Sequence, residues 1–237
     1  MKTLNRAQVA LRKLAKPDRV SALKYFYKTG PGQYGEGDEF IGISVPDNRS
    51  VAMKFLDASA TELSQLFKSP IHEDRAMALH ILVENYRSTK ELKTKKAIVQ
   101  FYLKHKKFVN NWDLVDMSAH KIVGHFCHLI NNHTLLKKLS RSNVHWDKRI
   151  AMVSTFALIR NHEVDLTFAF AKIYLNETED LMHKAAGWML REAGKKNLKK
   201  LLAFIQVHGK KMPRTMLRYS IEKLKPDHRK KILLETK

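Results

Sequence analysis

The chain has 237 residues, of which 44% are hydrophobic, enough to bury a folded core and too many for a disordered chain. Cys127 is the only cysteine, which excludes an intramolecular disulfide and any structural zinc site that needs two or more thiolates. The 44 Lys and Arg residues against 23 Asp and Glu give a formal charge of +21, so we expect an anionic partner: nucleic acid, an anionic membrane surface or an acidic protein.

The start of the chain, residues 1–6, has no apolar region of the kind that a secretory signal requires. No apolar run approaches the ~18 residues of a membrane span. We therefore expect a protein of the reducing cytoplasm.

Apolar side chains recur at helical spacing along almost the whole chain. Residues 11–14 belong to a first short helix and residues 17–27 to a second, in which Pro17 suits the first turn. The same spacing returns over residues 76–86 and continues to residue 173. The breaks are short, so neighbouring helices are expected to be antiparallel. They fall at Ser69-Pro70, Asn110-Asn111, Asn131-Asn132, Asn161-His162, Gly194, Gly209 and Pro226.

Residues 29–46 depart from this pattern. They have no helical period and hold five of the nine glycines, which predicts a loop or a small hairpin. Gly30, Gly32 and Gly35 match a dinucleotide-binding fingerprint in form, but no strand precedes them and no helix starts on them, so no nucleotide site is expected. A flexible insertion between two helices is our interpretation, and a wing that contacts DNA is the alternative.

A weak internal repeat places comparable residues 34 to 40 positions apart, at His72, Trp112, Trp146 and His183. This period is typical of a HEAT-type solenoid, in which each repeat is a pair of helices. One pair cannot bury its apolar stripe alone, so stacked neighbours bury it, and a small rotation between pairs curves the body. We therefore predict an all-α, HEAT-like solenoid, an α-α superhelix with a concave basic face, as a single domain over residues 1–237.

Metal and nucleophile chemistry have little support in the sequence. His120, His125, Cys127 and His128 are close together, but no carboxylate lies among them and no His-Glu-x-x-His occurs. Half-buried histidines on one helix are therefore expected, with no metal and no cofactor. No Gly-x-Ser-x-Gly elbow or phosphate-binding lysine loop is present, which argues against esterase and nucleotide-hydrolysing chemistry.

Positive charge is concentrated near the C-terminus, where residues 195–237 hold 14 Lys and Arg against 3 Asp and Glu. A second basic cluster extends over residues 90–107. Any single lysine is explained by a solvated helix face, but the whole set indicates a surface that binds phosphates.

Each of the three tryptophans stands close to a charged side chain. Trp112 precedes Asp116 by four residues, so both lie on one face of a helix that Asn111 can cap. The other two pairs are Trp146 with Arg149 and Trp188 with Arg191. Core packing accounts for many tryptophans, but a carboxylate one turn from an indole is best explained by a cation or a sugar between them.

Four segments, in chain order, resemble motifs of the AlkD-like DNA alkylation repair proteins. Residues 111–116 look like the Trp-x-x-x-Asp motif of that family, 146–151 like its arginine motif, 183–192 like its second tryptophan motif and 211–219 like its basic C-terminal segment. The resemblance covers residues 15–225. It implies an all-helical HEAT-like solenoid and a DNA N-glycosylase of base excision repair, which removes N7- and N3-alkylated purines.

The resemblance also implies roles for single residues. Asp116 matches the catalytic carboxylate, and Trp112 and Trp188 match the aromatic residues that pack on the deoxyribose of the lesion. Arg149 matches an arginine that contacts the DNA backbone near the lesion.

A tyrosine of the family's N-terminal helix corresponds to Tyr25 or Tyr27. The glycine-rich insertion after Tyr27 breaks the register, so both stay open. Further DNA contacts are expected from basic residues in the matching segments: Lys148, Lys184, Arg191, Arg214 and Arg218.

The chemistry suits such a site. An alkylated purine is already cationic and leaves without protonation, so the protein has to stabilise an oxocarbenium-like sugar. A carboxylate and two indole faces do this by charge attraction and cation–π attraction. The resemblance implies that the lesion stays stacked while the sugar and backbone are bound, whereas most glycosylases flip the base.

Two other interpretations stay open: a non-catalytic HEAT-repeat protein that binds bent or branched DNA, and a scaffold for RNA or an acidic protein. Asp116 with both tryptophans favours the enzyme, whereas residues 29–46, as a DNA-contacting wing, favour the binder. We predict double-stranded DNA with alkylated bases as the partner, without a membrane or a small-molecule cofactor. The protein is expected to be a monomer in the cytoplasm, associated with the nucleoid when it is bound to DNA.

Overall fold

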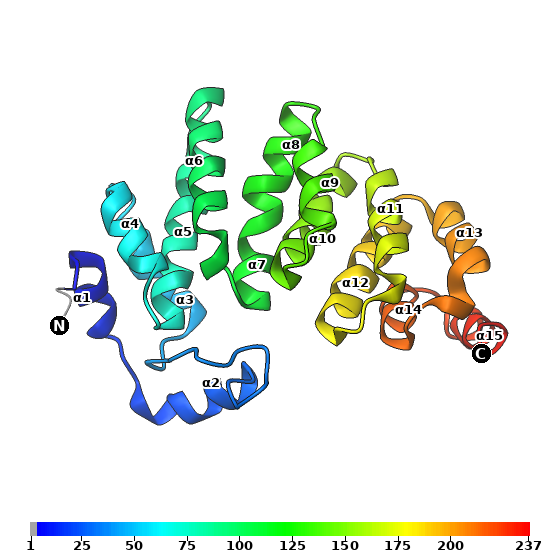
Figure 1. Ribbon diagram of the computed structural model, residues 1–237, viewed down its shortest axis with the longest axis horizontal. Helices are drawn as coiled ribbons and strands as arrows, with labels where there is room; N and C mark the ends of the chain where they lie inside the picture. Colours follow the sequence, from blue (N-terminus) through cyan, green and yellow to red (C-terminus); the bar gives the residue numbers. More distant parts are fainter. Residues whose placement is uncertain (1–3) are drawn as a thin grey trace. The chain divides into compact units, whose positions relative to one another are not determined.

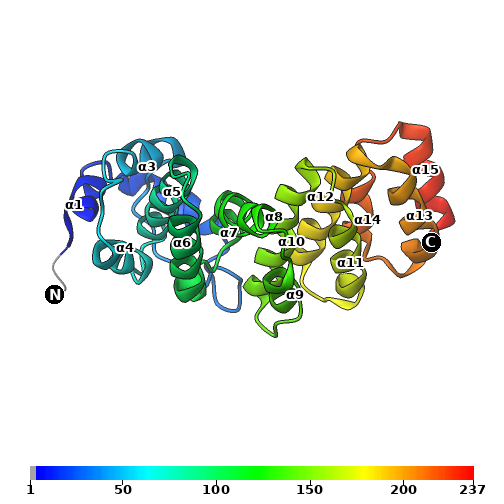
Figure 2. The ribbon, with the colours of Figure 1, turned by 90° about the horizontal axis from the view of Figure 1, so that it is seen from above.

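The computed structural model describes residues 4–237, and over these residues it is all-helical (Figures 1 and 2). The predicted all-α class is confirmed. Contacts group the chain into two compact units, Met1–Ser118 and Ala119–Lys237. Each unit is described by itself below, and the expected single domain over residues 1–237 stays a prediction.

The N-terminal unit is built around one long helix, with shorter helices packed on it. Its elements are α1 (Arg6–Arg12), the 3₁₀ turn η1 (Pro17–Arg19), α2 (Val20–Phe26), α3 (Val45–Ala52), α4 (Ala60–Phe67), α5 (His72–Ser88), α6 (Leu92–His105), the 3₁₀ turn η2 (Lys106–Phe108) and the first part of α7 (Trp112–Ala119). Helices α3, α4 and α6 all contact α5. The middle of α5 is fully buried, with Met77, Leu79 and Ile81 in the core of the unit.

Local sequence explains where several of these helices begin. Asn5 and Gln8 form a reciprocal capping box at α1, and Ser59 and Glu62 form another at α4. At α3, the Ser44 side chain accepts the backbone N–H of Asp47.

The glycine-rich segment is a loop and not a hairpin, since residues 27–44 form no strand and make only an isolated bridge between Glu39 and Ile71. We expected a flexible insertion, but part of this loop is fixed by hydrogen bonds to α5. The Glu73 carboxylate at the start of α5 accepts the backbone N–H groups of Ile41, Gly42 and Ile43 at 2.9–3.2 Å. The second half of the loop is therefore held against α5.

Gly42 is required at this position for two reasons. Its φ of +86° lies in the region that side chains disfavour, and a Cβ there would meet the Lys16 carbonyl oxygen at 1.9 Å. The Lys16 N–H also donates to the Ile41 carbonyl at 2.9 Å, so the loop returns to the segment that precedes η1.

The C-terminal unit repeats a helix pair. Its elements are the π-helical turn η3 (His120–Gly124), α8 (His125–Leu129), α9 (Thr134–Ser140), α10 (His145–Arg160), α11 (Asp165–Ile173), η4 (Tyr174–Asn176), α12 (Asp180–Lys196), α13 (Leu198–His208), η5 (Gly209–Lys211), α14 (Arg214–Ser220) and α15 (Pro226–Glu235). Within this unit η3, α10, α12 and α14 pack in sequence on one another. Helices α9, α11 and α13 cover this row from the other layer, as Figure 1 shows.

The repeat predicted from the sequence corresponds to real helix starts. His72, Trp112, Trp146 and His183 lie in or next to the first turns of α5, α7, α10 and α12. A helical-repeat arrangement is therefore confirmed, whereas the HEAT class and the concave basic face stay predictions. No helix among residues 4–237 is both long and apolar enough to span a membrane.

Candidate functional site

An aromatic stack in the N-terminal unit brings Tyr27 and Trp112 together. The Tyr27 ring lies between Phe40 of the loop and Trp112 of α7, with centroids 5.0 and 5.7 Å away and interplanar angles of 20° and 19°. Phe26 meets Trp112 edge-on at 5.7 Å. Tyr27 is buried by this stack, whereas Tyr25 is 78% exposed and carries Lys28 over its ring.

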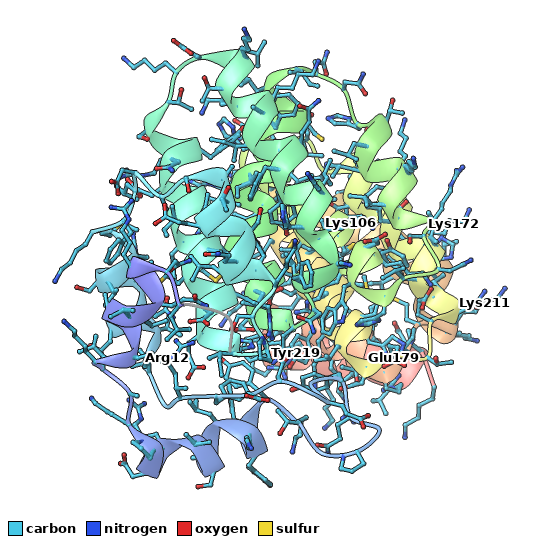
Figure 3. All side chains as sticks on the ribbon, turned by 60° about the vertical axis from the view of Figure 1, so that its left-hand side comes forward. Arg12, Lys106, Lys172, Glu179, Lys211 and Tyr219 are labelled. Atoms are coloured by element: carbon cyan, nitrogen blue, oxygen red, sulfur yellow. The ribbon has the colours of Figure 1, made fainter. Side chains whose placement is uncertain are left out.

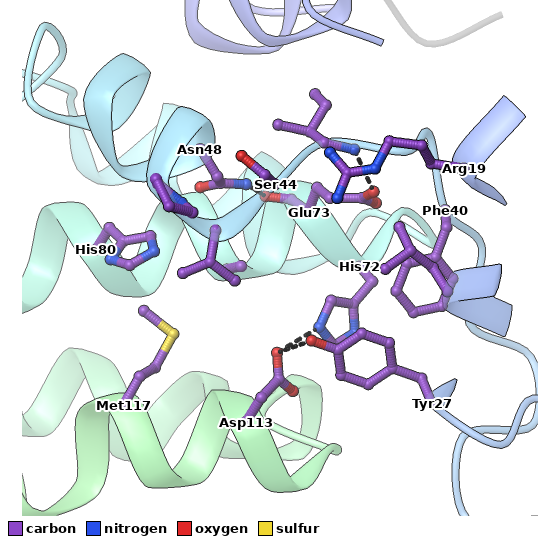
Figure 4. Close-up of a pocket in the computed structure, with 15 residues that line it drawn as sticks. Arg19, Tyr27, Phe40, Ser44, Asn48, His72, Glu73, His80, Asp113 and Met117 are labelled. Atoms are coloured by element: carbon purple, nitrogen blue, oxygen red, sulfur yellow. Dashed lines mark hydrogen bonds and ion pairs between the residues drawn. The ribbon is translucent and has the colours of Figure 1, made fainter. Parts of the chain in front are cut away.

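The Tyr27 hydroxyl points into a buried chain of charged groups. It donates to Asp113 Oδ2 at 3.2 Å, and the same oxygen accepts from His72 Nε2 at 2.8 Å. His72 Nδ1 lies 3.0 Å from Asp38 Oδ2, and Arg75 donates to the other Asp38 oxygen at 2.5 Å. We call these five residues the buried relay. Figure 4 shows three of them, Tyr27, His72 and Asp113.

Burial and charge shift the titration of the relay. Burial alone would lower the pKa of His72, but the Asp113 carboxylate, with the hydrogen bonds to Asp113 and Asp38, outweighs it and raises that pKa to about 9. Burial and the nearby Asp113 charge raise the pKa of Tyr27 far above its ordinary value. For Asp38, burial acts to raise the pKa, but the His72 hydrogen bond and the charge of Arg75 lower it.

A second connection leads from the relay to the first turn of α7. Asn111, which is fully buried, donates to Asp38 Oδ2 at 3.4 Å, and its side-chain oxygen accepts the Trp112 backbone N–H at 2.8 Å. This bond goes to the first residue of α7 and not to the second or third helical N–H that a cap would bind, so the predicted capping role of Asn111 stays a prediction.

A cavity of about 330 Å³ opens beside the relay (Figure 4). Tyr27, His72 and Asp113 line it, together with Phe40 and Asn48. Asp113 Oδ1 and Asn48 Oδ1 are buried here without a hydrogen-bond partner among residues 4–237, so both remain free as acceptors.

Trp112 and Asp116 lie on α7, four residues apart, and both are half-buried. The helical spacing expected from the sequence is therefore observed, and it places the two side chains on one face. Asp116 belongs to the N-terminal unit, as do Trp112 and Tyr27.

The remaining predicted residues belong to the C-terminal unit. Trp188 on α12 is half-buried, and its ring lies 6.0 Å from that of Phe156 on α10. Beside it on α12, Gly187 lets α14 approach closely, because a Cβ there would meet the Met216 carbonyl oxygen at 2.6 Å.

Arg149 is buried more deeply in the protein than a contact to the DNA backbone would require. It is only 4% exposed, and its Nη1 donates to the Leu181 carbonyl at 2.6 Å, at the start of α12. The predicted DNA contact of Arg149 stays a prediction, but the residue also joins α10 to α12.

Most of the other predicted basic contacts already have a partner within the chain. Lys148 pairs with Glu177 at 2.6 Å, Lys184 with Asp180 at 2.6 Å, and Arg191 with Glu192 and Glu222. Of these pairs, Lys184–Asp180 is exposed on both sides, and such pairs contribute little to stability. The DNA contacts of these residues stay predictions.

The last two predicted contacts differ from each other. Arg214 donates weakly to the Thr236 and Leu233 carbonyls at the end of α15, at 3.4 Å. Arg218 is exposed on α14, and its side chain makes no hydrogen bond or ion pair with any residue from 4 to 237. Other basic side chains of this unit, such as Lys172 and Lys211, extend from the helix surfaces (Figure 3).

The histidine group around Cys127 is not assembled as a site. Cys127 is buried, and His128 donates to Glu163 at 2.6 Å. Within residues 4–237, no group of three or more His, Cys, Asp or Glu side chains is arranged to hold a metal ion.

Sequence reasoning missed the relay. In the sequence, His72 stands out only as a position of the repeat, and Asp113 only as a residue within the tryptophan motif. The available signal was the polar run at residues 72–75, where an amphipathic helix would normally bury apolar side chains. Its partners Asp38 and Asp113 lie 34 and 41 residues away, so the pairing itself had no local signal.

Comparison with known proteins supports the resemblance. The sequence matches the family model of the DNA alkylation repair enzymes over residues 7–224. A solved structure from Enterococcus faecalis, described as a predicted DNA alkylation repair enzyme, superposes with a TM-score of 0.69 at 18% identity, covering 90% of this chain and 97% of that chain. At this identity it supports the fold alone. No curated protein matches the sequence.

Proposed function

Because this chain belongs to the DNA alkylation repair enzyme family, we propose that it is a DNA N-glycosylase that releases cationic alkylated purines from duplex DNA. The observation that carries the proposal is the face of α7 on which Trp112 and Asp116 lie, with Tyr27 stacked on Trp112. An indole and a carboxylate on one helix face offer a cationic sugar both of the interactions that stabilise it.

In the proposed reaction, the C1′–N bond breaks and its electron pair neutralises the alkylated purine, which leaves as a free base. Asp116 stabilises the oxocarbenium-like sugar and orients the water that attacks C1′. That water supplies a hydroxyl to C1′ and gives its proton to the Asp116 carboxylate, which passes it to solvent, so the products are the free base, an abasic site and a proton. No metal or cofactor takes part in this scheme.

We assign to Tyr27 the position of the family's N-terminal tyrosine, since Tyr27 and not Tyr25 is stacked beside Trp112. Because the Tyr27 side chain is buried, we propose that it acts by supporting Trp112. We assign Trp188 and Arg149 to the sugar and backbone from the family resemblance, and both belong to the C-terminal unit. We further propose that the protein acts as a cytoplasmic monomer, which joins the nucleoid when it is bound to DNA.

Release of 7-methylguanine and 3-methyladenine from methylated duplex DNA tests the function. We expect both bases to appear with the protein and an abasic site to form for each base released. Unmethylated duplex of the same sequence is the control and should yield no free base. Tight, salt-sensitive DNA binding without base release would overturn the glycosylase and favour a non-catalytic binder of bent or branched DNA.

Arg218→Ala is expected to weaken duplex binding equally on all sequences and to lower the salt slope of log K by about one. Arg218 is exposed and unpaired among the described residues, so its guanidinium is available to a phosphate without breaking an internal pair. Titrations at several salt concentrations measure the slope. Arg87→Ala is the matched control, since Arg87 is 76% exposed but already pairs with Glu84 on its own helix. An unchanged slope in Arg218→Ala would remove α14 from the DNA contact surface.

A further inference from the structure

We propose that His72 is a positioning residue of the excision site: held between Asp38 and Asp113, it fixes Tyr27 and the first turn of α7. This inference rests on the proposed glycosylase function, and it concerns a residue that none of the sequence motifs assigned. His72 does not touch the reacting atoms, because its side chain is 4% exposed and faces two carboxylates and aromatic rings.

The hydrogen bonds of His72 determine its charge. Each ring nitrogen lies within 3.0 Å of a carboxylate oxygen, and an ionised carboxylate can only accept. Both ring nitrogens must therefore donate, so His72 is an imidazolium. The raised pKa of His72 agrees with this geometry.

The charges of the relay balance only when His72 is protonated. Asp38 and Asp113 carry two negative charges, and Arg75 and His72 supply two positive ones. Loss of the His72 proton would leave an unpaired buried negative charge beside the Tyr27 hydroxyl, which is costly in a low-dielectric interior. Glu73, the next residue on α5, is not hydrogen-bonded to the relay, because its carboxylate accepts from the loop amides of Ile41 to Ile43.

Two routes lead from His72 to the catalytic face of α7. Through Asp113, His72 holds the oxygen that accepts the Tyr27 hydroxyl, and the Tyr27 ring in turn stacks on Trp112. His72 also holds Asp38, whose Oδ2 accepts from the Asn111 side chain. The Asn111 side-chain oxygen in turn accepts the backbone N–H of Trp112. Both routes set the orientation of Trp112, and Asp113 precedes Asp116 by less than one turn.

Substitution of His72 by Asn or by Gln tests the two routes one at a time, since each amide replaces one of the two ring nitrogens. His72→Asn keeps a donor near the position of Nδ1 and loses the bond to Asp113, whereas His72→Gln keeps a donor near Nε2 and loses the bond to Asp38. We expect His72→Asn to slow single-turnover base release by ~10- to 100-fold, the cost of misplacing reacting groups by up to ~1 Å. His72→Gln should recover part of that loss, and duplex affinity should stay within about twofold for both.

The dependence of the base-release rate on pH distinguishes a positioning role of His72 from a purely structural one, because a structural histidine would not change it. With a pKa of about 9, His72 loses its proton as the pH rises through that value, so wild-type release should decline there. In His72→Gln this decline should be absent. Rates are taken at saturating protein and divided by the rate of spontaneous depurination at each pH. His228→Asn, on exposed α15, is the matched control and should keep the wild-type profile.

Ring-nitrogen NMR of ¹⁵N-histidine-labelled protein tests the relay without activity. At pH 7.5 the His72 resonances, assigned from their absence in His72→Gln, should show both ring nitrogens protonated. A neutral ring would overturn the proposal, and so would wild-type release rates in His72→Asn. If the wild type releases no base at all, the proposed function fails, while a doubly protonated ring would still support the relay as a structural device.

Discussion

Asp116→Asn is expected to abolish release of alkylated purines while the protein still binds duplex DNA with nearly unchanged affinity. The substitution keeps the size and hydrogen-bonding shape of the side chain on α7 and removes its charge. A carboxylate ~4 Å from the developing sugar cation contributes ~4 kcal/mol at an effective dielectric constant of ~20. That energy corresponds to a rate effect of ~10³, which acts on the transition state and not on ground-state binding.

Single-turnover release of 7-methylguanine and a fluorescence-based Kd measure the two quantities on the same duplex. Asp57→Asn is a suitable control, because Asp57 is an exposed carboxylate of the same unit, and among residues 4–237 it pairs only with Arg6. It should match the wild type in both measurements. Release by Asp116→Asn within a few-fold of the wild type would show that the oxocarbenium is stabilised by another group.

Arg75→Met is expected to lower the free energy of unfolding by ~3–5 kcal/mol, because it removes one of the two cations, Arg75 and His72, that balance the buried carboxylates of the relay. The Arg75 and Asp38 side chains are 4% and 3% exposed and meet at 2.5 Å. Arg75 also donates to the Ser69 and Pro70 carbonyls at 3.0 Å, and the substitution leaves both acceptors without that donor.

Urea denaturation at pH 7 measures this loss. Arg87→Met serves as the control, since the Arg87–Glu84 pair is exposed and such pairs contribute ~0–1 kcal/mol. The double substitution Asp38→Asn, Arg75→Met removes both charges and should recover part of the stability. A loss of less than ~1 kcal/mol in Arg75→Met would contradict the prediction, since His72 alone would then balance the charge of Asp38.

The relay also sets a pH dependence of stability. The folded-state pKa of His72 is raised above its ordinary value, to about 9, so its contribution is fully present below pH ~6.5 and is lost as the pH rises through 9. The pKa of the Asp38 carboxyl is lowered, so its contribution to the stability of the folded protein is lost as the pH falls through that pKa. The unit is therefore most stable between these two limits.

The sequence by itself determined the helical class, the repeat and one face of the site. A period of 3.6 residues is a local property, so apolar spacing predicted helices, and the short breaks at Asn110-Asn111 and Asn131-Asn132 are helix ends in the structure. The same geometry placed Trp112 and Asp116 on one face of α7 before any tertiary contact was known.

Only the tertiary structure decided which residues surround that face. It placed Tyr27 and not Tyr25 beside Trp112, pinned the glycine-rich loop to α5, and buried Arg149 between α10 and α12. It also assembled Asp38, His72 and Asp113, which are separated by more than 30 residues along the chain. Buried charged groups are stable only when they are paired, and tertiary packing decides which of them meet. Such pairs therefore cannot be predicted from the spacing of residues along the sequence.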